Sequence, residues 1–295
     1  MAETVLGAEP IVRLGFFVAI LAAVGIWEVL VPRRKRSLTR LKRWPSNLAI
    51  AALNTMVLRI VFPTAAIGVA LLGEERGWGL LNVFALPEWI AVLIAVVVLD
   101  FAIYLQHVLF HAVPSLWRLH RMHHADLDFD VTTGVRFHSI EVVLSMGIKL
   151  MVVTALGAPA LAVLIFEVLL NATSLFNHGN VRIPLSFDRV LRWLVVTPDM
   201  HRVHHSWYPN ETNSNFGFNL PWWDRLLGTY KDQPRDGHEG MTIGINLFRE
   251  PAWERLDRML IQPFIGPAHS YPINAREVDR VSSGESSSKD TEEQN

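Results

Sequence analysis

Residues 87–111 read PEWIAVLIAVVVLDFAIYLQHVLFH and join a long apolar run to two histidines. The apolar part, residues 87–106, has about the 20 residues that an α-helix needs to cross the hydrocarbon core of a bilayer. His107 and His111 are four residues apart, a spacing that places both imidazoles on one face of a helix, one turn from each other. The segment therefore predicts a membrane-spanning helix that ends in a pair of metal ligands.

The composition of the whole chain agrees with a membrane protein. Of its 295 residues, 51% are hydrophobic and 19% charged, with a mean hydropathy of +0.26, whereas about 25% of the residues of a soluble domain are charged. The absence of cysteine excludes disulfides, iron–sulfur clusters and thiolate ligands or nucleophiles. A net charge of −1 gives the chain no electrostatic bias towards nucleic acid.

Other apolar runs predict further spans on both sides of residues 87–106. Residues 11–31 are long enough to cross a bilayer and end at Pro32, before seven basic residues within 33–43. A cleavable signal peptide is the alternative, but its basic residues should precede the apolar run. Residues 47–72 and 87–106 flank a short loop and predict an out-and-back pair of helices.

Residues 140–156 and 160–176 are separated by Gly157-Ala158-Pro159, which predicts a tight helical hairpin. Each arm is short for a full crossing, so a spanning hairpin and a re-entrant hairpin both remain possible. The fold class expected is thus an all-α integral membrane protein with four to five transmembrane helices.

Residues 107–138 and 177–270 are too polar to face lipid and predict a cytoplasmic helical cap. We expect three regions along the chain. They are an N-terminal helix with its basic loop (1–43), a membrane-embedded catalytic domain (44–270) and a polar, disordered tail (271–295).

Histidines are concentrated in three short motifs, one HxxxH and two HxxHH. These motifs comprise His107 and His111; His120, His123 and His124; and His201, His204 and His205. One histidine alone could be a packed or interfacial side chain, but packing has no use for this repeated spacing, whereas neutral imidazole is the commonest metal ligand. His238 and His269 lie outside the motifs and are expected to be surface residues.

The predicted topology delivers all of these motifs to one side of the membrane, because an even number of crossings separates them. By the positive-inside rule the basic loop 33–43 makes this side the cytoplasm. His138 directly precedes the hairpin and His178 directly follows it, so both become candidate ligands as well.

Ten imidazoles are too many for one ion, since a catalytic zinc typically has three protein ligands. Two metal ions are therefore expected. The chain has neither the HExxH motif of zinc proteases nor the Glu-x-x-His of carboxylate-bridged di-iron bundles. An all-nitrogen site suits iron, zinc, copper or nickel, so the ligand types alone leave the metal open.

The motifs resemble those of the fatty acid hydroxylase superfamily, which includes sterol desaturases and alkylglycerol monooxygenase. The resemblance covers about residues 44–230. It is carried by HVLFH (107–111), RFH (136–138), NHGN (177–180), HRVHH (201–205) and NFGFNLPWWDRLLGTY (215–230), together with HRMHH at 120–124. It implies a di-iron enzyme that uses O2 and two electrons to hydroxylate or desaturate C–H bonds of a membrane lipid, such as a fatty acyl chain or a sterol.

In this resemblance the ten histidines hold two iron ions, and Asp100, Glu141 and Asp224 are candidates to accept imidazole N–H bonds. The chain has no fused haem domain like cytochrome b5, no GxGxxG motif and no cysteine. Electrons are therefore expected from a separate cytochrome b5-, ferredoxin- or reductase-like partner. The main alternative is a zinc-dependent membrane lipid hydrolase, and a metal transporter or storage protein is a third possibility.

Charged residues within the apolar runs have a simpler interpretation. Arg59, Lys149 and Glu167 are expected to form ion pairs or to extend towards the membrane surface rather than to line a substrate path.

Overall fold

The computed structural model describes residues 8–84, 86–267 and 271–273, and these residues form helices and loops without any β-sheet. The long helices are α2 (Glu9–Leu30), α3 (Arg40–Val61), α4 (Ala65–Arg76), α5 (Glu88–Ala112), α7 (Ser139–Leu156) and α8 (Ala160–Asn177). The shorter helices are α6 (Pro114–His124), α9 (Leu185–Leu191), α10 (Pro198–His204), α11 (Pro209–Thr212), α12 (Trp222–Leu226), α13 (Gly237–Gly240) and α14 (Leu256–Ile261). Four 3₁₀ turns complete the elements: η1 (Leu80–Asn82), η2 (Val131–Val135), η3 (Pro251–Glu254) and η4 (Gln262–Phe264).

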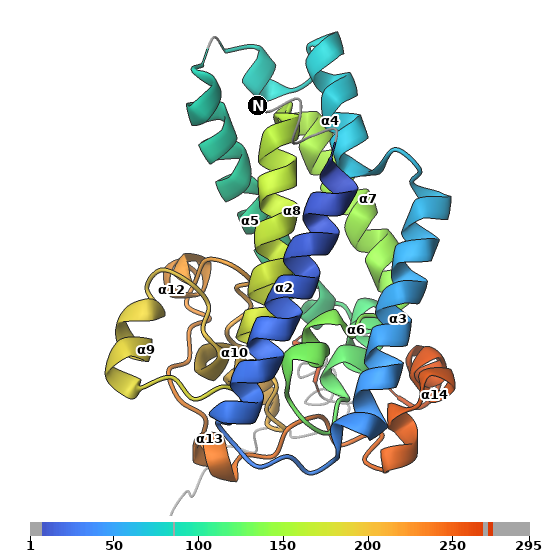
Figure 1. Ribbon diagram of the computed structural model, residues 1–295, viewed down its shortest axis with the longest axis vertical. Helices are drawn as coiled ribbons and strands as arrows, with labels where there is room; N and C mark the ends of the chain where they lie inside the picture. The colour runs from blue at the N-terminus through green and yellow to red at the C-terminus, as the bar shows by residue number, and fades with distance from the viewer. Residues whose placement is uncertain (1–7, 85, 268–270, 274–295) are drawn as a thin grey trace, which may run out of the picture.

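Five helical segments are long and apolar enough to cross a membrane. They are Glu9–Leu30, Arg40–Asn82, Glu88–Ala112, Ser139–Leu156 and Ala160–Asn177. Figure 1 shows the long helices extending together from one end of the molecule, while α6 and α9 to α14 gather at the other end as a cap. The predicted all-α membrane fold is thus confirmed.

The second segment differs from the single helix predicted for residues 47–72. It is broken between α3 and α4, where Phe62 leaves the helical conformation at φ −129° and ψ 71°. Pro63 follows directly. A proline lacks the N–H that the next helical turn needs and disfavours a helical backbone at the residue before it. The break therefore follows from Pro63.

The α7–α8 hairpin turns at Gly157, whose φ of +67° lets it cap α7 by donating its N–H to Val153 O and Thr154 O. This turn touches the loop that joins α4 to α5. A Cβ on Gly79 would lie 2.0 Å from Gly157 N, and the Glu74 carboxylate accepts the Ala160 N–H at 2.8 Å. The hairpin thus reaches as far from the cap as the loop between the second and third spans, which favours a full crossing over a re-entrant turn.

A buried ion network attaches the cap to the start of α3. Arg43 pairs with Asp126 at 2.6 Å and with Asp130 at 2.5 Å, and Arg136 pairs with Glu254 at 2.5 Å. All five side chains are buried. Guanidinium groups can be buried in this way only when carboxylates match their charge and hydrogen bonds. The network fixes the segment between α6 and α7, which carries η2, against the bundle.

The polar groups inside the apolar helices pair with one another. Glu167 is buried in α8, where it accepts a hydrogen bond from Lys149 of α7 at 2.8 Å and forms an ion pair with Arg13 of α2 at 3.0 Å. These ion pairs agree with the structural role expected for Lys149 and Glu167 and connect three of the spanning helices.

The packed part of the chain extends beyond residue 270, where the polar tail was expected to begin. Tyr271 is buried and donates its hydroxyl to Trp207 O at 2.8 Å. Ile273 N donates to His111 O at 2.9 Å. The rest of the predicted tail, residues 274–295, lies outside the described residues, as does His269.

Candidate metal centre

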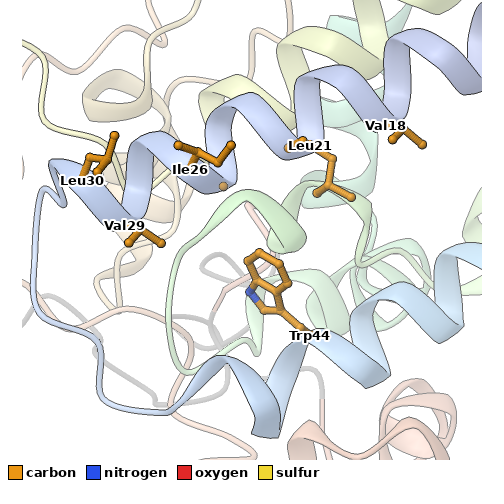
Figure 2. Close-up of a pocket in the computed structure, with 8 residues that line it drawn as sticks. Val18, Leu21, Ile26, Val29, Leu30 and Trp44 are labelled. Atoms are coloured by element: carbon orange, nitrogen blue, oxygen red, sulfur yellow. The ribbon is translucent and has the colours of Figure 1, made fainter.

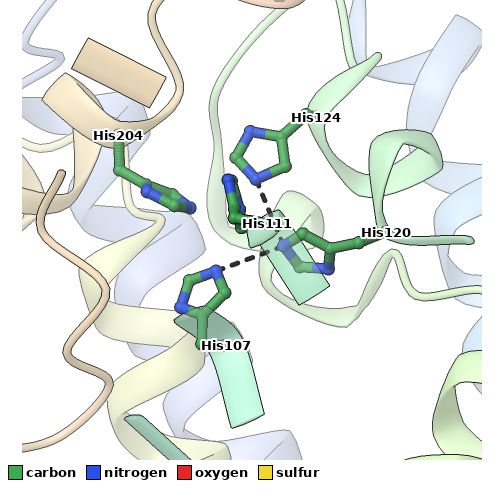
Figure 3. A group of neighbouring side chains, drawn as sticks. All are labelled: His107, His111, His120, His124 and His204. Atoms are coloured by element: carbon green, nitrogen blue, oxygen red, sulfur yellow. Dashed lines mark hydrogen bonds between the residues drawn. The ribbon is translucent and has the colours of Figure 1, made fainter. Parts of the chain in front are cut away.

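Nine buried histidines converge at the junction between the bundle and the cap, in two groups. The first consists of His107, His111, His120, His124 and His204, and the second of His123, His178, His201 and His205. Within each group, one ring nitrogen from every member lies within 4.8 Å of all the others. Figure 3 shows the rings of the first group pointing towards a common centre from α5, α6 and α10. The structure therefore brings together nine of the ten predicted ligands, in two clusters that each suit one ion.

Local sequence explains how the chain delivers these rings. The last turns of α5 carry His107 and His111, after which Pro114 starts α6 at its first position, where a missing N–H costs nothing. On α6 and α10 the offsets of three and four residues place the HxxHH imidazoles on one helical face. His178 caps the C-terminal end of α8. Four separate elements thus meet at the site.

The distances between ring nitrogens are those of metal ligands. Nε2 of His120 lies 3.1 Å from Nε2 of His107 and 3.2 Å from that of His124. In the second group, Nε2 of His178 lies 3.2 Å from that of His123 and 3.1 Å from that of His201. Imidazole nitrogens bind zinc at about 2.0–2.1 Å, so two neighbouring ligands lie about 2.9 Å apart at a right angle and about 3.3 Å apart at the tetrahedral angle, and the distances here fall between these values.

Hydrogen bonds cannot account for two of these contacts, His107–His120 and His123–His178, because in all four rings the opposite nitrogen already donates. Their acceptors are oxygens, which cannot donate in return. Five rings donate from Nδ1. His107 donates to Phe216 O (2.8 Å), His120 to Glu141 Oε1 (2.6 Å), His123 to Arg136 O (3.3 Å), His178 to Ser174 O (2.7 Å) and His204 to Ser214 O (2.7 Å). A neutral ring that donates from Nδ1 has only a lone pair at Nε2. In these two pairs, one in each group, a lone pair therefore faces another lone pair, an arrangement that a cation between them makes favourable.

Several other ring nitrogens in the site are buried and have no hydrogen-bond partner among the described residues. They include Nε2 of His111 and of His204, and both ring nitrogens of His205. A buried polar atom without a partner costs free energy, and native proteins rarely leave one. Metal ions held by these nitrogens would satisfy them, so the residues present fit a two-metal centre.

The protonation state also suits metal binding. Burial, reinforced by the neighbouring imidazoles, holds the pKa of His123, His124 and His201 well below the usual value of histidine, and the same holds for His204 and His205. Burial lowers the pKa of His178 to about 3. These rings are therefore neutral at physiological pH, which is the form that binds a metal.

The three predicted acidic residues have different positions relative to the histidines. Glu141 accepts the Nδ1 proton of His120 rather than that of His138, its neighbour in sequence. Asp224 accepts from the N–H groups of Phe216 and Gly217, both at 2.8 Å, and so holds the loop whose carbonyl binds His107. Burial raises the pKa of Asp224 to about 6.

Asp100 accepts from Trp223 Nε1 at 2.7 Å and from Leu220 N at 3.4 Å. Its contacts thus tie α5 to the segment around α12. None of the hydrogen bonds among the described residues joins Asp100 to a histidine of the site, so its position is that of a structural anchor.

The structure does not bring His138 to the centre. Its Nδ1 accepts the Ile140 N–H at 3.2 Å and caps α7, while its Nε2 donates to Leu260 O at 3.2 Å. Both ring nitrogens are therefore occupied. The expectation that His238 lies on the surface is wrong: it is buried, with Nε2 3.6 Å from a carboxylate oxygen of Asp199.

Most of the groups that orient the rings carried no signal in the sequence. Four of the five acceptors just described for Nδ1 are backbone carbonyls, which every residue possesses. Asn213, whose side-chain oxygen lies 3.1 Å from Nδ1 of His111, was also not predicted. Asparagine is too common in loops for its position to have identified it.

Comparison with known proteins shows which family the chain is similar to. The fatty acid hydroxylase family model matches residues 92–229. The chain is 34% identical over 149 residues to an ornithine lipid hydroxylase of Rhizobium tropici, covering 50% of this chain and 44% of that protein. It is 29% identical over 154 residues to alkylglycerol monooxygenase of Xenopus tropicalis (50% and 32%) and 30% identical over 146 residues to human cholesterol 25-hydroxylase (48% and 51%).

The matched region spans about half or less of the length of these relatives. No solved structure matches the chain significantly. All nine clustered histidines fall within the residues that the family model matches. Over this region, which contains the whole candidate metal centre, the chain is similar to the fatty acid hydroxylase family.

Proposed function

We propose that this protein is an O2-dependent di-iron oxidoreductase that hydroxylates or desaturates a C–H bond of a membrane lipid, such as a fatty acyl chain or a sterol. One observation carries the proposal: each histidine group contains a pair of Nε2 lone pairs that face one another, His107–His120 at 3.1 Å and His123–His178 at 3.2 Å. Two such groups at the membrane end of an apolar bundle suit a pair of metal ions that act on lipid. The names of the relatives, which are hydroxylases and a monooxygenase, favour hydroxylation.

The nine clustered histidines would hold the two iron ions, five around one and four around the other. Iron bound there supplies the power to oxidise an unactivated C–H bond with O2 and two electrons. The contribution of the protein is to keep the rings oriented through their Nδ1 hydrogen bonds and to exclude water, since all nine side chains are buried.

Several phenylalanines lie against the rings, Phe218 and Phe137 among them. Phe218 packs on the hydrophobic core of the spanning helices and also lies 5.3 Å from the ring of His107 and 6.2 Å from that of His201. Phe137 stacks on His123 with ring centroids 4.5 Å apart. Phe218 is therefore placed to contact a lipid chain that enters from the bilayer, and its size would affect which carbon is presented.

Electrons would come from a separate cytochrome b5-, ferredoxin- or reductase-like partner, because the chain has no cysteine with which to hold an iron–sulfur cluster. We place the metal centre and the cap on the cytoplasmic side. The basic loop after α2 belongs to the same end as the cap, since Arg33 pairs with Asp199 of α10 at 3.1 Å, and basic loops are retained in the cytoplasm.

Metal content and cofactor dependence test the proposal. Full-length protein purified in detergent should contain about two irons and should convert its lipid substrate only with both O2 and a reductant. The substrate class can be found by comparing the lipids of cells that express the wild type, His123→Ala or His138→Ala. His138→Ala is the matched control, since this histidine lies outside the centre. Anaerobic hydrolysis with bound zinc, or no oxygenated or unsaturated product, would contradict the assignment.

A further inference from the structure

One side of the cap presents a large apolar surface that no described residue covers. It is formed by α9 with the turn that follows it, and by α12. Its most exposed side chains are Leu185, Phe187, Val190, Trp193, Leu194 and Leu226, each at least 57% exposed. We call this surface the α9–α12 face. Soluble surfaces rarely expose so many large apolar side chains together, and those that do usually bind a protein or a membrane.

The two helices form one continuous surface. Trp222 of α12 donates its Nε1 proton to Trp193 O at 2.7 Å, and the guanidinium of Arg225 lies 3.8 Å from the centre of the Trp193 ring. Figure 1 shows α9 and α12 together on one side of the cap, away from α14. Because these contacts join the two helices, their apolar side chains act as a single face.

Backbone hydrogen bonds fix the height of this face relative to the membrane. Arg182 N donates to Val31 O at 3.0 Å, and Arg33 N donates to Asn180 O at 2.9 Å. These bonds join the segment before α9 to the end of α2, the first spanning helix. The chain enters α9 at Leu185, only three residues after Arg182. The α9–α12 face therefore begins where α2 leaves the hydrocarbon.

Hydrocarbon reaches the last turn of α2. An apolar groove of about 430 Å³ lies between α2 and Trp44 of α3 and is lined on the α2 side by residues from Val18 to Leu30. Figure 2 shows these side chains along α2, opposite Trp44. Val29 and Leu30 are exposed in this last turn. Exposed apolar side chains at the end of a spanning helix are stabilised by contact with lipid, which puts the expected bilayer boundary near the level of α9.

The charges around the face match a lipid surface. Within residues 181–194, Arg189 is exposed and Arg182 is exposed beside Glu239, whereas Arg192 is buried and paired with Asp188 and Asp232. The basic residues 33–36 follow the same end of α2. Arginines near the boundary attract anionic headgroups, and tryptophans such as Trp193 prefer the interface. A symmetric contact with a second copy would instead set this face against itself and bring like charges together.

We propose that the α9–α12 face inserts into the leaflet next to the cap, at the boundary between headgroups and acyl chains, as a membrane anchor separate from the spanning helices. Surface helices of this type bury their apolar face by about 5–10 Å. This anchor would hold the segment from Phe216 to Asp224, which contacts the centre through His107, at a constant depth.

The absence of cysteine from the chain permits a direct test. Single cysteines are introduced at Phe187, Val190 and Leu226 of the full-length protein, spin-labelled, and reconstituted into nanodiscs that contain anionic phospholipid. Leu93→Cys, on the exposed side of α5, gives the value for a label in hydrocarbon, and Glu239→Cys, on α13, gives the value for one in water. Electron paramagnetic resonance then compares the relaxation of each label by O2 with that by a water-soluble nickel chelate.

The three labels on the face should be relaxed more by O2 than by nickel, as at Leu93, whereas the label at Glu239 should show the reverse. Bound iron equal to that of the wild type verifies that each variant is folded. Relaxation by nickel at all three positions as strong as at Glu239 would overturn the proposal. So would labels shielded from both reagents, because a protein partner would then cover the face.

Discussion

His123 and His138 belong to the same stretch of chain, but their ring nitrogens have opposite surroundings. Nε2 of His123 faces another lone pair, that of His178, whereas both nitrogens of His138 are occupied by backbone hydrogen bonds. We predict that His123→Ala loses bound iron and activity. His138→Ala should keep its iron and lose only about 1 kcal/mol of stability, the usual effect of removing a helix cap.

Elemental analysis and thermal unfolding of both purified variants measure these effects. Loss of iron from His138→Ala, with the protein still folded, would show that His138 binds a metal in a conformation other than the one described here.

Glu141 acts through His120, whose Nδ1 proton it accepts at 2.6 Å. Glu141→Gln keeps the shape of the side chain and an acceptor oxygen but removes the negative charge that makes the imidazole a stronger ligand. We expect iron affinity or activity to fall by about 10- to 100-fold, as for other partners of metal ligands. Titration with a chelator measures the affinity, and Glu75→Gln, in the exposed last turn of α4, serves as the control. Equal affinities would mean that orientation alone matters.

His238 predicts a pH dependence of stability. Burial lowers its pKa to about 3; Asp199 opposes this shift, and Arg202, Arg33 and Arg192 add to it. Unfolded histidine titrates near pH 6.5, so at acidic pH the unfolded chain binds a proton that the folded chain does not. The contribution of His238 is therefore complete above about pH 6.5 and declines as the pH falls towards 3.

We predict that lowering the pH from 7 to 5 decreases the melting temperature of His238→Gln by less than it decreases that of the wild type. The clustered histidines titrate in both proteins, so the difference between the two profiles isolates His238. Parallel profiles would show that His238 takes up its proton while the protein is still folded.

At the scale of the elements, the contact between Gly79 and Gly157 holds the α7–α8 hairpin against the α4–α5 loop. A Cβ on Gly79 would lie 2.0 Å from Gly157 N, whereas one on Gly77 would meet nothing within 4 Å, although both glycines have positive φ. We predict that Gly77→Ala costs about 1 kcal/mol through its backbone conformation alone. Gly79→Ala should cost about 1–3 kcal/mol more because the backbones must separate.

Unfolding of the two variants in the same detergent gives the comparison. The metal centre lies at the opposite end of the bundle, so folded Gly79→Ala protein should still bind iron. Equal stability of the two variants would mean that the hairpin turn and the loop do not pack closely in solution.

At the scale of the whole molecule, the proposed orientation places the cap in the cytoplasm and the α4–α5 loop outside. Glu75→Cys at the end of α4 should therefore react with a membrane-impermeant maleimide in intact cells. Glu239→Cys in the cap should react only after the membrane is permeabilised. The native chain contributes no thiols, so each signal comes from one position. The reverse pattern would place the metal centre outside the cell.

The sequence alone determined the spanning helices and the histidine motifs, because both depend on short-range spacing. The apolar run before His107 has the length of a membrane-spanning α-helix. Offsets of three and four residues put the imidazoles on one helical face. Even the break at Pro63, which was not predicted, has a local cause in that proline.

Only the tertiary structure decided which histidines share a centre. His138 and His178 flank the hairpin symmetrically in sequence, yet only His178 reaches the site. Its ring is oriented by Ser174 O and that of His107 by Phe216 O, and both acceptors are backbone carbonyls that have no signature in a sequence. The burial of His238 and the uncovered α9–α12 face likewise depend on which segments pack together. Such contacts exist only once distant parts of the chain have met, so no local pattern of residues can specify them.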